Sequence, residues 1–265
     1  MASVEAERGG RRAWLQGFRD VDRILRGDST RLDSLREGGI SVASGRLTGA
    51  VVLLFMAYGV CMATFSLLSP NGPSLGQILA TTIKVPLLFY LTLAVTLPSL
   101  YVFNALVGSR LTFPSMAKLF SATLGVNAAV LCSMGPIVAF FSVCTTSYPF
   151  MVLFNVAVFA TAGFLAQGFL LQTLQRLSIA QSLEADDGAP VDRPGPLRPL
   201  NDPFLGKHVK TIFRVWVVLF GLVGAQMGWV LRPFIGNPNI PFTLFRPRES
   251  NFFEAVLHAI SRLFS

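Results

Sequence analysis

Charged residues are scarce in this chain, and acidic residues are missing from its entire middle part. Only 14% of the 265 residues are charged, whereas a soluble domain carries about 25%. No Asp or Glu occurs between Gly39 and Ala180. So few charges cannot cover a water-exposed surface, which excludes a soluble globular protein, and the apolar composition excludes a disordered or collagenous chain.

Histidine and cysteine are also rare, and this limits the chemistry that the chain can carry. The two histidines are His208 and His258, and the three cysteines (Cys61, Cys132 and Cys144) form no CxxC pair. The sequence contains no HExxH, Walker or GxGxxG motif. We therefore expect packing thiols, no catalytic residue, no metal site, no cofactor and no enzymatic activity.

Apolar residues make up 52% of the chain and gather in long runs. About 20 consecutive apolar residues span a bilayer as a helix. The sequence therefore predicts an all-α, polytopic transmembrane helix bundle of five spans. They are 48–69, a span within 77–108 that is most uniformly apolar over 85–108, 119–142, 149–172 and 215–231. The fifth has only seventeen residues between Arg214 and Arg232, whose side chains can snorkel to the headgroups.

The basic residues predict the orientation of these spans. The N-terminal tail, residues 1–46, carries nine arginines and no apolar signal-peptide core. With five spans, seventeen basic residues lie on the side of this tail and five on the other side. The positive-inside rule then places the N-terminus in the cytoplasm and the C-terminus outside. We ascribe the net charge of +8 to contact with anionic lipid headgroups rather than with nucleic acid.

Both ends of the chain carry amphipathic segments that indicate interfacial helices. In residues 13–26 the apolar side chains are Trp14, Phe18, Val21 and Leu25, and Arg19, Arg23 and Arg26 lie between them. This pattern favours a helix on the inner leaflet with its arginines at lipid phosphates, the alternative being docking on the protein's own cytoplasmic loops.

The C-terminal part, residues 236–265, is expected to be an outer loop followed by the second amphipathic helix, 250–264. Its apolar face comprises Phe253, Val256, Leu257, Ile260 and Phe264. This helix lies on the outer leaflet or folds back onto the bundle of residues 47–235. Arg232, Arg246 and Arg248 are candidate contacts for lipid phosphate or an acidic partner. Five prolines predict a cytoplasmic linker over about 184–205.

Polar side chains inside the spans allow two interpretations. Lys84 precedes Pro86 at the outer start of the second span, where it snorkels to the interface or lines a substrate path. Amides in a bundle form hydrogen bonds between helices or line a polar path. The amides concerned are Asn104, Asn127, Asn155, Gln167 and Gln226.

A stripe of small residues marks the fifth span. Gly224 and Gly228 form a GxxxG motif, and Gly221 lies about one turn earlier. Small residues let another helix approach closely. The neighbour is another helix of the same chain, or else a second subunit or a second copy of this chain.

Three runs resemble an uncharacterised family of bacterial inner-membrane proteins: KVPLLFYLTLAVTLPSLYVFNALVG (84–108), GAQMGWVLRPFIG (224–236) and FRPRESNFFEAV (245–256). The resemblance implies a bacterial inner-membrane protein with five spans and no known activity. At the level of architecture alone, the chain also resembles Yip1-type membrane proteins. Together these features predict a non-enzymatic scaffold or accessory subunit, the alternative being a small transporter, channel or lipid-handling protein.

The topology can be tested with reporter fusions. Alkaline phosphatase after Ser265 is expected to be active, and green fluorescent protein at the N-terminus or within 184–205 is expected to fluoresce. Enzymatic activity and fluorescence of each fusion are the measurements. Reporters that place both ends in one compartment contradict the five-span topology.

Overall fold

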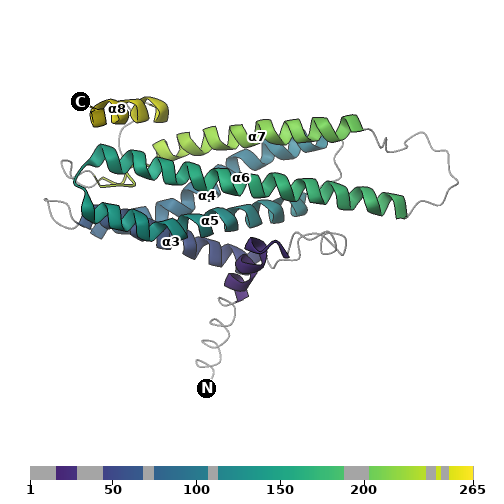
Figure 1. The fold of residues 1–265 in the computed structure, drawn as a ribbon, viewed down its shortest axis with the longest axis horizontal. Helices are drawn as coiled ribbons and strands as arrows, with labels where there is room; N and C mark the ends of the chain where they lie inside the picture. The colour runs from purple at the N-terminus through teal and green to yellow at the C-terminus, as the bar shows by residue number, and fades with distance from the viewer. Residues whose placement is uncertain are drawn as a thin grey trace, which may run out of the picture.

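A computed structural model describes residues 16–28, 44–67, 75–106, 113–187, 203–236, 243–245 and 251–264. Within these ranges the chain forms seven helices and no strand, which confirms the all-α expectation. A short helix over 16–25 comes first. The others are α3 (Ser44–Leu67), α4 (Leu75–Leu106), α5 (Phe113–Cys144), α6 (Tyr148–Asp187), α7 (Pro203–Val230) and α8 (Phe252–Phe264). Helices α3 to α7 lie along a common long axis as an elongated bundle (Figure 1).

Four of these helices are long and apolar enough to cross a membrane. The segments are Gly45–Leu67, Leu75–Ser99, Met116–Cys144 and Tyr148–Thr173, with mean hydropathies of 1.9 to 2.1. They contain most of each of the first four expected spans. Helix α7 differs, because only Arg214–Val230 is apolar and this stretch is shorter than the other four.

The outer surface of the bundle is apolar. Phe164 on α6 is 78% exposed, Leu79 on α4 is 64% exposed and Phe140 on α5 is 63% exposed. Soluble monomers rarely expose large contiguous apolar surface. Side chains of this kind are suited to hydrocarbon rather than water as their solvent.

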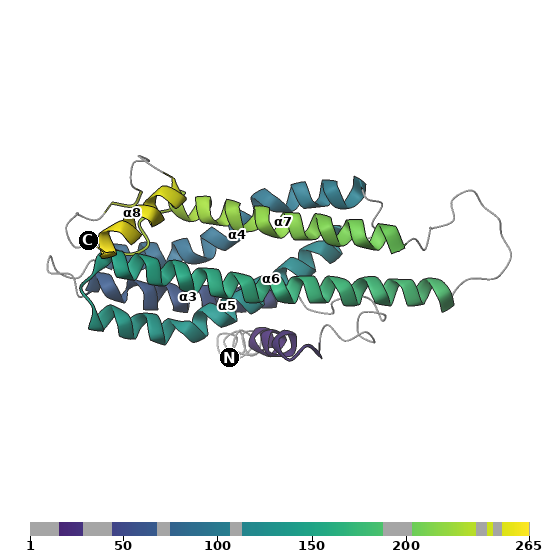
Figure 2. The same cartoon turned by 45° about the horizontal axis from the view of Figure 1, so that its top comes forward.

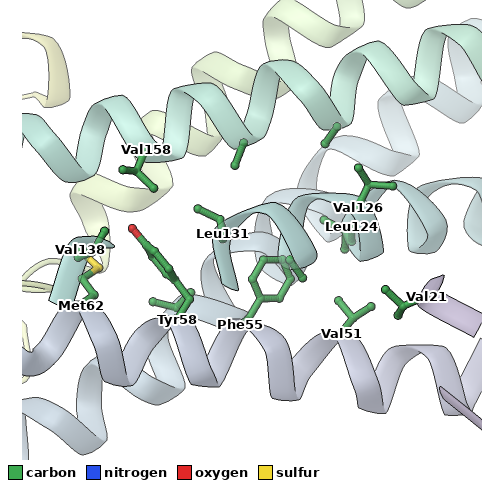
Figure 3. Packing of buried hydrophobic residues seen from close by; sticks show 14 of the residues in the cluster. Val21, Val51, Phe55, Tyr58, Met62, Leu124, Val126, Leu131, Val138 and Val158 are labelled. Carbon is green, nitrogen blue, oxygen red and sulfur yellow. The ribbon is translucent and has the colours of Figure 1, made fainter. Parts of the chain in front are cut away.

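Helix α3 packs against both α4 and α5 and supplies the middle of the main core. Figure 3 shows Val51, Phe55 and Tyr58 of α3 pointing toward α5 and α6. Phe55 also stacks on Phe89 of α4, with ring centroids 4.5 Å apart. A second cluster around the buried Trp216 joins α4, α5, α6 and α7. The interior of the bundle is thus apolar, and polar side chains buried in it require hydrogen-bond partners.

Two glycines permit close contacts of α3 with α4 and α5. A Cβ at Gly59 of α3 would lie 2.9 Å from Thr82 Cα and 3.1 Å from Thr81 O, both backbone atoms of α4. A Cβ at Gly135 of α5 would lie 3.1 Å from Cys61 Sγ of α3. Since helices in lipid associate mainly through close van der Waals packing, these contacts draw α4 and α5 against α3.

Helical residues extend into both ends of the linker that was expected over about 184–205. Helix α6 continues to Asp187, and α7 begins at Pro203, so both ends of the 184–205 segment are helical. Residues 184–187 contain no proline, and proline is well tolerated at the first position of a helix. The remaining residues, 188–202, lie outside the described ranges (Figure 2).

Gly59→Ala is expected to destabilise the bundle, because the new methyl group meets α4 backbone that cannot rotate away. Overpacking of this kind costs about 1–3 kcal/mol. Gly221→Ala is the matched control, since nothing lies within 4 Å of its Cβ position. Thermal unfolding of the purified protein in detergent is the measurement. Equal midpoints for the two variants would contradict the close α3–α4 contact.

Candidate functional site

Helix α4 presents a buried polar stripe within an otherwise apolar sequence. Gln77, Thr81 and Lys84 follow the i, i+4, i+7 spacing of one helix face. Their exposed fractions are 2%, 0% and 3%. Burial of polar and charged groups is unfavourable unless they form hydrogen bonds. We refer to these three residues as the α4 clamp.

The partners of the α4 clamp come from the backbone that follows α7. Residues 231–236 are not helical, and they lie buried against the adjoining ends of α3 and α4. Leu231 and Ile235 are each 5% exposed. A Cβ at Gly236 would lie 2.8 Å from Ser66 Cβ of α3, so glycine lets the backbone approach this closely.

Two carbonyls of this segment accept hydrogen bonds from the α4 clamp. The Pro233 carbonyl lies 3.2 Å from Gln77 Nε2 and 3.4 Å from Lys84 Nζ. The Phe234 carbonyl lies 3.1 Å from Gln77 Nε2 and 2.7 Å from Thr81 Oγ1. Buried backbone carbonyls outside a helix need hydrogen-bond donors from elsewhere in the protein. The α4 clamp supplies them.

Lys84 holds a second segment in addition. Its ammonium donates to the Leu244 carbonyl and lies 4.8 Å from the centroid of the Phe245 ring. Backbone carbonyls and an aromatic face both stabilise a cation electrostatically. Lys84 therefore joins residues 233 and 244 to α4.

The expectation that Lys84 lies at the start of its helix is wrong. Its side chain is buried against the backbone of residues 233 and 244. The reason is the start of α4 at Leu75, nine residues before Lys84. That distance is about 14 Å along the helix axis, so Lys84 lies well inside the helix rather than at its end.

Part of the predicted glycine stripe packs against another helix of the same chain. A Cβ at Gly224 would lie 3.5 Å from Thr92 Cγ2, and a Cβ at Gly228 would lie 3.9 Å from Leu88 Cδ1. Both neighbours belong to α4, and both distances are ordinary van der Waals contacts. Gly221 has no neighbour within 4 Å. The motif thus lies at the α4–α7 contact without requiring glycine there.

The predicted amides separate into different roles. Asn155 of α6 accepts a hydrogen bond from the Tyr58 hydroxyl of α3 at 3.0 Å and donates to Met151 O at 2.9 Å. Asn127 of α5 is buried, and its Oδ1 has no hydrogen-bond partner in the part of the chain that the structure describes. Gln226 is half-buried on α7. The Asn104 side chain lies outside what the structure describes.

The helix over 16–25 docks on the bundle through one face only. Val21 and Ile24 are 4% and 1% exposed, and Gly17 lies against Arg46 and Ala50 of α3. Val21 was expected on the lipid face with Phe18 and Leu25. The docking is the reason that it lies on the bundle face instead.

Beside this bundle face, the same helix has an apolar face and a charged face. Phe18 and Leu25 remain 40% and 50% exposed. Arg19 and Arg23 are exposed, and Arg26 pairs with Asp22 at 2.9 Å. Trp14 lies outside the described residues.

Helix α8 folds back beside α6 and α7 (Figures 1 and 2). Asn251 caps its N-terminus, since the Glu254 N–H donates to Asn251 Oδ1 at 2.9 Å. Phe253, Leu257 and Ile260 remain 48%, 66% and 39% exposed. The helix therefore keeps an apolar stripe that the bundle does not cover.

Of the three candidate lipid-contact arginines in the C-terminal part, the structure describes only Arg232. Its guanidinium lies 3.7 Å from the centroid of the Trp229 ring. Arg246 and Arg248 lie outside the described residues.

Comparisons with protein-family models, with curated proteins and with solved structures gave no match. The resemblance to bacterial inner-membrane proteins and to Yip1-type proteins therefore stays an expectation. What the chain can do has to be argued from its own geometry.

Two members of the α4 clamp, Gln77 and Thr81, were not among the candidates from sequence. The sequence does carry a signal for them, because they precede the one lysine of this helix at the i, i+4, i+7 spacing of a single helix face. The sequence-based spans instead begin too late and place Lys84 at a span end. The stripe becomes visible only when α4 is recognised as starting at Leu75.

Thr81→Val is expected to lower the free energy of unfolding by about 1 kcal/mol, because the Phe234 carbonyl loses a donor. Thr161→Val is the control, since the Thr161 hydroxyl is exposed and donates to Ala157 O of its own helix. Lys84→Met is expected to have a larger effect, about 1–3 kcal/mol, because it leaves buried carbonyls with fewer donors. Hydrogen exchange measured by mass spectrometry should accelerate in residues 231–245 for both clamp variants. Unchanged exchange there in Lys84→Met would contradict the role of the clamp.

Proposed function

We propose that this chain is a non-enzymatic integral membrane protein that acts as a scaffold or accessory subunit of a membrane assembly. In this proposal it has five spans, a cytoplasmic N-terminus and an external C-terminus. The seventeen residues Arg214–Val230 rise about 26 Å as a helix. Residues 231–236 then continue toward the adjoining ends of α3 and α4, which supports α7 as a fifth crossing.

The main observation in support of the proposal is that Lys84 bonds to backbone carbonyls of its own chain. Ionisable residues at membrane depth commonly mark ion or substrate paths. Here the ammonium binds the carbonyls of residues 233 and 244, so it contributes to holding the chain together. Gln77, Thr81 and Asn155 are also bonded within the chain. The polar side chains of the bundle thus support a structural role better than a transport role.

The exposed apolar surfaces support contacts with lipid and with other subunits. Figure 1 shows α8 at the left end of the bundle and the helix over 16–25 below its middle, and each leaves an apolar stripe uncovered. Arg19 and Arg23 beside the first stripe suit anionic headgroups of the inner leaflet. Phe164 and Val218 show that α6 and α7 also present large apolar side chains outward.

A small transporter or channel is the second candidate, and Asn127 is the observation that favours it. This residue borders a cavity of about 30 Å³ between α4, α5, α6 and α7. A cavity of this size accommodates about one water molecule. A larger hollow of about 550 Å³ is lined by apolar side chains, including Leu97, Pro98 and Phe113. Neither is suited to a polar solute larger than water.

Purification from native membranes in mild detergent, with and without prior cross-linking, tests the proposal. A scaffold or subunit is expected to elute in a stoichiometric complex whose mass exceeds that of the chain and its detergent. Reconstituted liposomes are expected to show no solute flux above empty liposomes. A lone monomer together with flux that Asn127→Leu abolishes would establish the transporter instead.

A further inference from the structure

Asn127 is a buried carboxamide whose oxygen has no hydrogen-bond partner in the described part of the chain. It lies on α5 and is 4% exposed. Buried polar side chains in native proteins nearly always have a partner, which can be protein or ordered water. An unsatisfied acceptor at this depth is unfavourable, because the apolar surroundings offer nothing in exchange for lost solvation. The oxygen therefore calls for a donor that the described chain does not supply.

The cavity beside Asn127 has the size and the lining for such a donor. Its volume is about 30 Å³. Trp216 and Phe220 of α7 contribute aromatic walls, whereas Thr123, Asn127 and Gln167 contribute polar atoms. The polar side chains come from α5 and α6, so they lie on two different helices.

The chemistry of these groups matches one water molecule. A buried water needs room for one molecule and two to four polar partners. Asn127 Oδ1 is an acceptor, and the Thr123 hydroxyl donates to Leu119 O at 2.9 Å, which leaves its own oxygen able to accept. The Gln167 amide can donate or accept.

We propose that Asn127 holds a structural water molecule in the cavity between α4, α5, α6 and α7, with Thr123 and Gln167 as its further partners. The water donates to Asn127 Oδ1 and so satisfies the carboxamide. It also bridges α5 to α6 through Gln167. Asn155 reaches the same result without water, because the Tyr58 hydroxyl is its donor. Asn127 and Asn155 are thus satisfied in different ways.

Water-edited solid-state NMR on the full chain in liposomes tests this site without any substitution. Asn127 is the only Asn that follows Val, and Asn155 is the only Asn that precedes Val. Samples labelled at Asn and Val therefore assign both side chains. Asn155 is the matched control, since it is 2% exposed and bonded within the chain.

The expected result is that magnetisation from water reaches the Asn127 side chain severalfold faster than it reaches the Asn155 side chain. A rate at Asn127 as slow as at Asn155 overturns the proposal. Transfer to Asn127 from lipid acyl protons, or from a differently labelled copy of the chain, also overturns it, because a lipid or a second helix then occupies the cavity. These results do not depend on whether the protein is a scaffold.

Discussion

Backbone carbonyls that are buried outside a helix cannot bond to bulk water, so the protein itself must supply their donors. This constraint applies to the chain after α7, where residues 232–236 are not helical and lie beside α3 and α4. Gln77, Thr81 and Lys84 supply these donors from a single face of α4. The ammonium of Lys84 is stabilised in turn by the carbonyl dipoles of residues 233 and 244 and by the Phe245 ring. The α4 clamp and these carbonyls can all be buried because they are hydrogen-bond partners of one another.

Close packing holds the remaining helices, since lipid removes most of the hydrophobic drive for helices to associate. Gly59 and Gly135 bring α4 and α5 against α3. A Cβ at Gly59 would collide with the α4 backbone, whereas a Cβ at Gly135 would crowd the Cys61 side chain. The GxxxG motif of α7, in contrast, meets α4 at ordinary contact distances. A small-residue motif therefore indicates that approach is possible, whereas the opposing backbone decides whether glycine is required.

The helix over 16–25 and α8 both dock on the bundle and still leave apolar side chains exposed. The helix over 16–25 packs on α3 through Val21 and Ile24, yet it leaves Phe18 and Leu25 exposed. Helix α8 contacts α6 and α7, yet it leaves Leu257 exposed. An amphipathic helix with a wide apolar face can thus dock on a bundle with one edge and offer the other edge to lipid.

The sequence by itself determined the helical class, four long apolar helices and the local signals at their ends. Asn251 caps α8, and the helix over 16–25 stops before Gly27, whose φ is 78°. These features depend on solvent transfer and on neighbours within one turn, which a linear pattern records directly. The tertiary structure alone decided what the polar side chains meet. Lys84 bonds to a carbonyl 149 residues away, and Tyr58 bonds to Asn155 97 residues away. Helical periodicity shows which residues share a face, but the helix that lies opposite that face is selected by packing across the whole bundle.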